Sequence, residues 1–306
     1  GGSEAPENTL AAFSNAIANG ANLVECDLRK SADDVLVCHH DTTVDRTTDG
    51  TGAIADMTIA EIKALDAGSW FGTEFAGEQI PTLVEALTLA NGQATIIIDP
   101  KYPHWAEDAA ATFDTTGFPS STIGVWADRA WWVDDFGTLV PGSTVIIRRN
   151  SSSTVESIIE WIADPDELSI ASAVAINWST STDLELLQEI IHLLHTQDLP
   201  VLGYIYNGSW QWDAAIELGM DGIIAQNPSA LSSYFEDLEC GNGLDDDLDT
   251  ASDYPADPEC NSLRGLSEQP TCSDGLDNDR DGLIDFPLDH GCDSETDSSE
   301  TNPVLP

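Results

Sequence analysis

The chain has 306 residues, of which 55 are acidic and 10 are basic, so its formal net charge at pH 7 is −45. This charge opposes electrostatic attraction to nucleic acid or to anionic lipid surfaces, and we exclude nucleic acid as a partner. An α/β barrel takes about 250 residues, so the length fits one large domain followed by a small appendage. No apolar run of about 18 residues occurs, so the sequence predicts no transmembrane segment.

Residues 8–228 alternate short β-rich runs with helical patterns, which is typical of βα units around a parallel sheet. Seven runs are predicted to be barrel strands, and an additional strand is predicted beside the first, at Val35–His40. The seven predicted strands are Leu23–Leu28, Ala94–Asp99, Ser121–Ala127, Thr144–Arg149, Ala173–Trp178, Pro200–Tyr206 and Gly222–Gln226. The helical patterns are Thr9–Ala18, Thr82–Ala90, Val155–Ala163, Leu184–His195 and Trp212–Leu218.

Seven strands are one short of a closed barrel, and an open barrel would leave two unpaired edges. We therefore expect a TIM (β/α)8 barrel whose first strand lies upstream of Gly1 and leads into the loop Gly1–Pro6. The pattern changes after Pro228, and periodic hydrophobic residues are absent from Glu239 onward. The predicted domains are thus a barrel at residues 1–235 and a tail at residues 236–306.

Polar side chains interrupt the apolar strands at positions suited to chemistry. Glu25 and Asp27 are two apart, so they lie on one face of a strand and suit a hard divalent cation. Asp99 and Lys101 repeat this spacing at a second strand end, and His40 ends the additional strand with a titratable imidazole. Salt bridges or a strand-end cap would explain each feature separately. Their convergence at the carboxyl ends of barrel strands favours one site.

Two stretches, GGSEAPENTLAAF and VECDLRKSADDVLVCHHDTTVDRTTDGTG, resemble the opening of the glycerophosphodiester phosphodiesterases. IPTLVEAL and GMDGIIAQNP also match that family, and the resemblance covers about residues 1–230. The family motifs fall at Pro6–Thr9 (Pro-Glu-Asn-Thr), Glu25 and Asp27 (Glu-x-Asp), His40–Asp41 (His-Asp), Arg46–Thr48 (Arg-Thr-Thr), and Asp99 and Lys101 (carboxylate-x-Lys).

The resemblance implies a metal-dependent phosphodiesterase. A divalent ion, Ca²⁺ or Mg²⁺, would be held by Glu25, Asp27 and Asp99. His40 and a second histidine would act as general acid and base while the glycerol 2-hydroxyl attacks phosphorus, and water would open the resulting cyclic phosphate. The products would be glycerol 3-phosphate and an alcohol. The residues expected to bind the substrate are Lys101, Glu7 and Tyr204.

The chain also departs from the family pattern. The first catalytic histidine and its arginine partner would immediately precede Gly1, so we expect the chain as given to be inactive or nearly so. Asp99 stands where the family has Glu, and Tyr204–Asn207 replaces an aromatic-Thr-Val-Asn segment. These changes put the choice of substrate in question, and related barrels cleave sphingomyelin or phosphoinositides. His39 should face away from the site and serve a structural role.

The tail at residues 236–306 holds 21 acidic and 2 basic side chains. Its cysteines form two groups with the same spacing, Cys240 to Cys260 and Cys272 to Cys292, which predicts a segment stapled by disulfides in an oxidising compartment. We therefore expect a secreted, periplasmic or cell-surface bacterial protein. The sequence leaves open whether Cys26 and Cys38 pair with each other.

A 32-residue unit occurs twice in the tail and resembles thrombospondin type 3 calcium repeats. One copy reads D-x-D-x-D-G-x-x-D, a pattern whose alternate carboxylates suit Ca²⁺, while Thr250 replaces the glycine in the other. A disordered acidic tail is the competing interpretation. The candidate ligands are Asp277, Asp279, Asp281 and Asp285 in one copy and Asp245, Asp247, Asp249 and Asp253 in the other.

The sequence leaves two classes of function open. The first is an exported enzyme that acts on a small-molecule glycerophosphodiester. The second is a calcium-dependent surface-binding protein with a catalytically degenerate barrel, in which the tail would attach the molecule to a cell surface.

Overall fold

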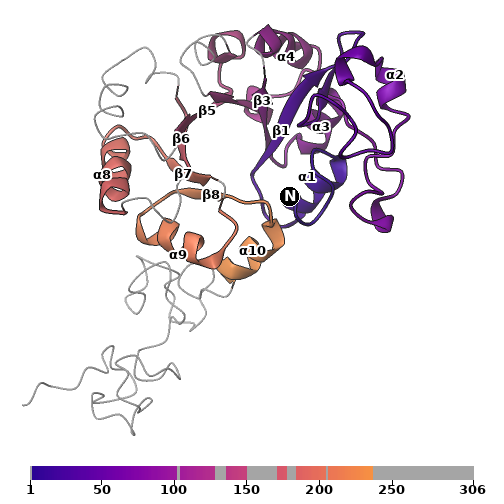
Figure 1. Ribbon diagram of the computed structural model, residues 1–306. Coiled ribbons are helices and arrows are strands. Elements are labelled where there is room, and N and C mark those ends of the chain that lie inside the picture. Colours follow the sequence, from indigo (N-terminus) through magenta and orange to yellow (C-terminus); the bar gives the residue numbers. More distant parts are fainter. Residues whose placement is uncertain are drawn as a thin grey trace, which may run out of the picture. The chain divides into compact units, whose positions relative to one another are not determined.

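The computed structural model describes residues 2–101, 104–127, 136–149, 171–177, 184–204 and 206–236. Its strands form one curled sheet in the order β2-β1-β3-β4-β5-β6-β7-β8, with helices on the outer side (Figure 1). All neighbours pair in parallel except β2, which is antiparallel to β1. The strands are β1 Leu23–Lys30, β2 Leu36–Cys38, β3 Thr95–Pro100, β4 Ile123–Ala127, β5 Thr144–Arg149, β6 Ala173–Ile176, β7 Val201–Tyr204 and β8 Gly222–Ile224.

Each of these strands coincides with a run that the sequence predicts, to within two residues at most ends, so the strand predictions are confirmed within the described residues. The mixed, curled sheet is consistent with an α/β barrel. No hydrogen-bond ladder joins β8 to β1 within the described part of the chain. Instead, Ser3 connects to the end of β8, because its backbone N and its Oγ donate to the carbonyl of Gln226 at 3.3 and 2.7 Å.

The helices are α1 Leu10–Ala18, α2 Ile59–Ile62, α3 Leu83–Ala90, α4 His104–Asp114, α8 Leu184–His195, α9 Ser209–Glu217 and α10 Pro228–Glu236. Helix α1 is capped by Thr9, and α3 opens with a capping box of Thr82 and Glu85, as expected for Thr at a helix start. Helix α8 has the predicted bounds, whereas α9 begins at Ser209 rather than Trp212. The predicted helix Val155–Ala163 lies outside the described residues.

Inside the curled sheet, side chains at alternate strand positions form an apolar core. The cluster consists of Ile97, Trp126, Ile146, Ala173, Ala175 and Leu202, with Leu23, Tyr204 and Ile224 packed against it. Two residues further along β1 and β3, the same face carries carboxylates, because Asp27 pairs in register with Asp99. The apolar layer therefore supports a polar layer at the carboxyl ends of the strands.

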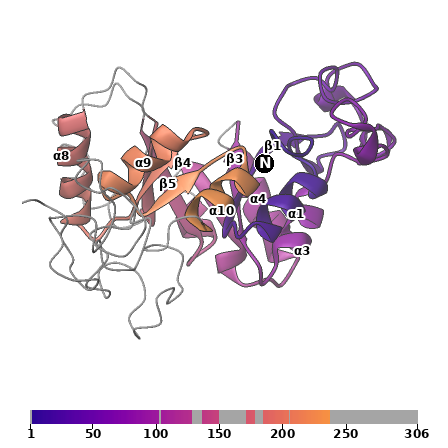
Figure 2. The ribbon, with the colours of Figure 1, turned by 90° about the horizontal axis from the view of Figure 1, so that it is seen from below.

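The segment between β2 and α3 lies to one side of the sheet and includes α2 (Figures 1 and 2). It has a small core of its own, to which Met57, Ile59 and Leu65 add partly buried side chains. The buried members are Val37, Val44, Ile54, Ile62, Ala67 and Ile80. This core fixes the loop after β2, which carries His40.

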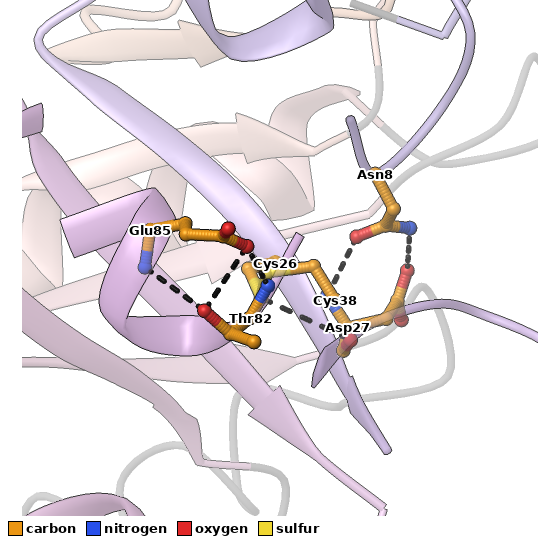
Figure 3. The surroundings of a disulfide bond; sticks show 6 residues. All are labelled: Asn8, Cys26, Asp27, Cys38, Thr82 and Glu85. Carbon is orange, nitrogen blue, oxygen red and sulfur yellow. Dashed lines mark hydrogen bonds between the residues drawn. A yellow bond between two sulfur atoms is a disulfide. The ribbon is translucent and has the colours of Figure 1, made fainter. Parts of the chain in front are cut away.

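A disulfide joins Cys26 on β1 to Cys38 on β2, with both residues fully buried (Figure 3). The pairing that the sequence leaves open is thus decided by the antiparallel register, which sets Cys38 opposite Leu28, two residues beyond Cys26. The disulfide connects the strand that bears the carboxylates to the strand that leads to His40.

The chain divides into two compact units, Gly1–Ser229 and Ala230–Pro306. Residues 237–306 lie outside the described residues, so the domain boundary after residue 235, the tail disulfides and the calcium repeats stay predictions. Among the helices that the structure describes, none is long and apolar enough to cross a membrane.

Candidate metal and phosphate site

Three acidic side chains converge on the inner face of the sheet. Glu25 and Asp27 come from β1 and Asp99 comes from β3, and one carboxylate oxygen from each lies within 4.8 Å of the other two. Asp27 and Asp99 are buried, with 5% and 6% of their surface exposed. The alternation of side chains in the two neighbouring strands produces this arrangement, as the Glu-x-Asp and Asp-x-Lys spacings predict. Carboxylate oxygens at this separation suit a Ca²⁺ or Mg²⁺ ion.

The electrostatics of the cluster also fit a cation. Burial, followed by the charges of Asp27 and Asp99, raises the pKa of Glu25 to about 8. Lys101 balances part of the negative charge, because its Nζ lies 2.5 Å from Asp27 Oδ1 and 2.7 Å from Asp99 Oδ2. Burial lowers the pKa of Lys101, but Asp99 and Asp27 outweigh that effect and raise it. The negative charge of the three carboxylates, when ionised, exceeds the single positive charge of Lys101. A bound divalent ion would offset this excess.

Asn8 orients Asp27 from the loop before α1. Its Nδ2 donates to Asp27 Oδ2 at 2.9 Å, and its Oδ1 accepts from the backbone N of Asp27 at 3.0 Å (Figure 3). Asn8 has a φ of 56°, a left-handed conformation that asparagine tolerates better than most residues. Sequence reasoning missed this role, although Asn8 lies within the Pro-Glu-Asn-Thr motif.

A second cation, Arg148 of β5, faces the same site. Its Nη2 lies 3.6 Å from Asp99 Oδ2, and its Nη1 donates to the hydroxyl of Tyr204 at 3.1 Å. The guanidinium carbon lies 5.6 Å from the ring centroid of Trp126 and 5.4 Å from that of Tyr204. Burial, aided by the charge of Glu25, raises the pKa of Tyr204.

The structure thus brings the predicted substrate residue Tyr204 into contact with the site, together with two residues that sequence reasoning missed, Arg148 and Trp126. The signal for Arg148 was an arginine at an inward position of the apolar run Thr144–Arg149, in a chain with 10 basic residues. For Trp126 the sequence offers no such signal, because an indole in a buried strand is ordinary core.

His40 is held by ion pairs on the loop after β2. Its Nδ1 lies 2.7 Å from Asp41 Oδ1, and Arg46 Nε donates to Asp41 Oδ2 at 2.7 Å. Arg46 also donates to both carboxylate oxygens of Glu7, at 2.8 and 2.6 Å. The hydrogen bond from Arg46, followed by that with His40, lowers the pKa of Asp41. We refer to these four residues as the His40 relay.

The His40 relay is more exposed than the acids, with 57% of the His40 side chain accessible. Among the described residues, no hydrogen bond or ion pair joins His40 directly to the carboxylates. The relay reaches them through the backbone, because Glu7 immediately precedes Asn8. Glu7, predicted to bind substrate, is paired with Arg46, and its contact with substrate stays a prediction.

His39 turns away from the site, as predicted. It is buried, its Nε2 lies 3.0 Å from the carbonyl of Thr43, and its backbone N donates to the carbonyl of Asp27 at 2.8 Å. His39 therefore links the loop to β1 and serves a structural role.

Comparison with known proteins identifies relatives for this arrangement. The model of the glycerophosphoryl diester phosphodiesterase family matches residues 1–230. A glycerophosphodiester phosphodiesterase of Caldanaerobacter subterraneus is 55% identical over 84 residues, which are 28% of this chain and 35% of that protein. Human glycerophosphodiester phosphodiesterase 1 is 45% identical over 113 residues, or 36% of this chain and 34% of that protein. The chain thus spans about a third of the length of these curated relatives.

Solved structures align over more of the chain. A glycerophosphodiester phosphodiesterase from Agrobacterium tumefaciens superposes with a TM-score of 0.58 and 27% identity, covering 75% of this chain and 94% of that one. A phosphodiesterase from Oleispira antarctica, in complex with its product sn-glycerol-3-phosphate, gives a TM-score of 0.62 and 25% identity, covering 75% and 91%.

Proposed function

Because the chain belongs to the glycerophosphoryl diester phosphodiesterase family, we propose that it hydrolyses glycerophosphodiesters to glycerol 3-phosphate and an alcohol with the help of a divalent cation. The observation that carries the proposal is the convergence of Glu25, Asp27 and Asp99 within 4.8 Å, at the carboxyl ends of parallel strands. The product in the Oleispira antarctica enzyme supports the choice of substrate class.

Glu25, Asp27 and Asp99 would hold the cation, either Ca²⁺ or Mg²⁺. Bound there, the cation would supply Lewis-acid stabilisation for the charge that develops on the phosphate oxygens. Asn8 keeps the Asp27 carboxylate in one orientation. Lys101, which bridges Asp27 and Asp99, would contact the phosphate from the side of these two acids. These groups together would fix the position of the phosphate before any bond changes.

His40 would transfer protons in this reaction. Asp41 pairs with His40 Nδ1, so Nε2 is the nitrogen available to the substrate. As the glycerol 2-hydroxyl attacks phosphorus, one histidine takes its proton and another protonates the leaving alcohol. Water then opens the cyclic phosphate to give glycerol 3-phosphate. The prediction that a second histidine and an arginine precede Gly1 stays a prediction.

We also propose an exported location for the protein and calcium binding by its tail. The buried disulfide between Cys26 and Cys38 supports an oxidising compartment, and with the tail cysteines it favours a secreted, periplasmic or cell-surface protein. Ca²⁺ would bind to the predicted tail aspartates, and attachment to a cell surface would follow from the tail.

Release of alcohol from a glycerophosphodiester, with and without a chelator, tests the proposal. We expect turnover that requires Ca²⁺ or Mg²⁺ and falls by at least about 100-fold in His40→Ala, with cation binding retained. Residues 1–306 are assayed beside the same chain extended by any residues encoded before Gly1, and full activity of residues 1–306 alone would refute the predicted upstream histidine.

The alternative function, surface binding, predicts a different outcome in the same assay. If the chain is a degenerate, calcium-dependent surface-binding protein, both forms should bind the cation, and neither should release alcohol from the substrate. Activity on sphingomyelin or phosphoinositides, without activity on water-soluble glycerophosphodiesters, would indicate a related barrel with another substrate.

A further inference from the structure

Arg148 occupies a position in the site that the proposed reaction does not require. Its guanidinium lies within cation–π distance of Trp126 and Tyr204, whose rings meet edge to face with centroids 5.2 Å apart. The hydrogen bond to the Tyr204 hydroxyl and the approach to Asp99 hold the guanidinium from two further directions. Arg148 therefore presents a fixed positive charge to the site.

This placement bears on the alcohol half of the substrate. Aromatic rings are the groups that proteins use to bind quaternary ammonium ions such as choline. Here the guanidinium of Arg148 already lies over the rings of Trp126 and Tyr204. An arginine stays charged at any accessible pH, so a cationic alcohol beside these rings would meet a like charge.

The charge balance of the site points the same way. Among the described side chains of the site, three carboxylates lie beside the cations Lys101 and Arg148. With Glu25 ionised and a divalent ion bound, these charges sum to one net positive charge, which a single phosphodiester anion would neutralise. A quaternary ammonium would add an uncompensated charge in a buried region, whereas an uncharged alcohol would not. The guanidinium already donates to one hydroxyl oxygen, that of Tyr204, at 3.1 Å, so its N–H groups suit hydroxyl oxygens. The buried Nε1 of Trp126 has no hydrogen-bond partner among the described residues, which adds a donor beside it.

We propose that Arg148 is a specificity-determining residue that selects glycerophosphodiesters with an uncharged polyol as the alcohol over those with a quaternary ammonium group. The inference rests on the proposed function and adds the class of alcohol to it.

The test compares kcat/KM for glycerophosphoglycerol and glycerophosphocholine, measured with saturating cation on whichever form of the chain is active in the alcohol-release assay. We expect the wild-type protein to favour glycerophosphoglycerol by at least about tenfold. The positive charges of Arg148 and of the choline group would lie close together in a partly desolvated site and repel each other. In Arg148→Gln this ratio should fall towards one. Lys63→Gln removes one positive charge from a lysine that pairs with Glu85 at 2.8 Å, away from the inner face of the sheet, and should keep the wild-type ratio.

Each outcome decides the inference. Arg148→Met is a second neutral variant in case Arg148→Gln does not fold, and the wild-type ratio is informative without either. A wild-type ratio near one, a preference for glycerophosphocholine, or the wild-type ratio in a folded neutral variant would overturn the role of Arg148 and leave the hydrolytic function standing. No turnover of either substrate by residues 1–306 or by the extended chain would overturn the proposed function, and this inference with it.

Discussion

The carboxylate cluster and the His40 relay are held in place by different means. Glu25, Asp27 and Asp99 lie on paired strands, and backbone register brings them together. His40 lies on a loop, where a series of half-exposed ion pairs through Asp41, Arg46 and Glu7 positions its ring. The cluster should therefore tolerate little change, whereas the relay should lose function in steps as its members are removed.

Asp27→Asn should cause the largest loss. Asp27 contacts Lys101 and Asn8 and contributes to the candidate metal site, so its removal takes one charge from a buried network. We expect turnover to fall by about 1000-fold and the measured affinity for Ca²⁺ or Mg²⁺ to collapse. Titration calorimetry and an alcohol-release assay measure the two effects.

Asp34→Asn is the matched control for that variant. Asp34 lies in the turn between β1 and β2, with 84% of its side chain exposed, and asparagine suits its φ of 64°. Activity and cation binding should equal those of the wild type. Normal cation affinity in Asp27→Asn would show that Glu25 and Asp99 suffice, and the three-carboxylate site would be wrong.

The disulfide connects the strand of the carboxylate cluster to the strand that leads to the His40 relay. Its removal should lower the stability of the fold more than the rate of turnover. Cys26→Ala with Cys38→Ala should lower the free energy of unfolding by about 3 kcal/mol, as expected for a loop of this length. Urea unfolding followed by tryptophan fluorescence measures this change. An unchanged unfolding midpoint would mean that the small core after β2 holds the two strands together without the covalent bond.

The pH dependence of cation binding separates the cluster from the relay. The pKa of Glu25 is raised to about 8, so below that pH the cation must displace a proton from the carboxyl group. Affinity should rise by up to about 100-fold between about pH 6 and pH 8 and level off above it. Calorimetry in buffers with different ionisation enthalpies should detect one proton released at the lower pH.

The stability of the metal-free protein should show the opposite trend. Because the folded pKa of Glu25 exceeds its ordinary value of 4.5, the unfolded state loses this proton first. Stability should therefore decline as pH rises from 4.5 towards about 8 and should recover when the cation is added. A metal-free melting temperature that rises across this range would contradict the raised pKa.

Arg46→Gln should have the smallest effect. Without Arg46, Asp41 keeps its contact with His40 but loses the pairing that connects it to Glu7. We expect kcat to fall by about tenfold, with cation affinity and KM near wild type, because the orientation of His40 is affected rather than binding. Arg46→Lys should restore part of the loss. Loss of cation binding in Arg46→Gln would show that the relay and the cluster form one unit.

The strands and most of the carboxylate cluster can be predicted from local sequence patterns. Alternation is local, so Glu25 and Asp27 had to share a face, and each apolar run had to be a strand wherever the structure describes it. Helix α8 followed from its periodicity in the same way, whereas α2, α4 and α10 were not predicted. The same spacing at a second strand end predicted that Asp99 and Lys101 join this site, and the family resemblance then implied the role of each.

Contacts between distant segments depend on how the whole chain folds. Arg148 reaches Asp99 and Tyr204 because β3, β5 and β7 curl around a common interior, which no local pattern encodes. The pairing of Cys26 with Cys38 required the register of β1 and β2, which depends on packing as well as on sequence spacing. Local periodicity fixes which way a side chain points, but only the packing of the whole sheet fixes what it meets.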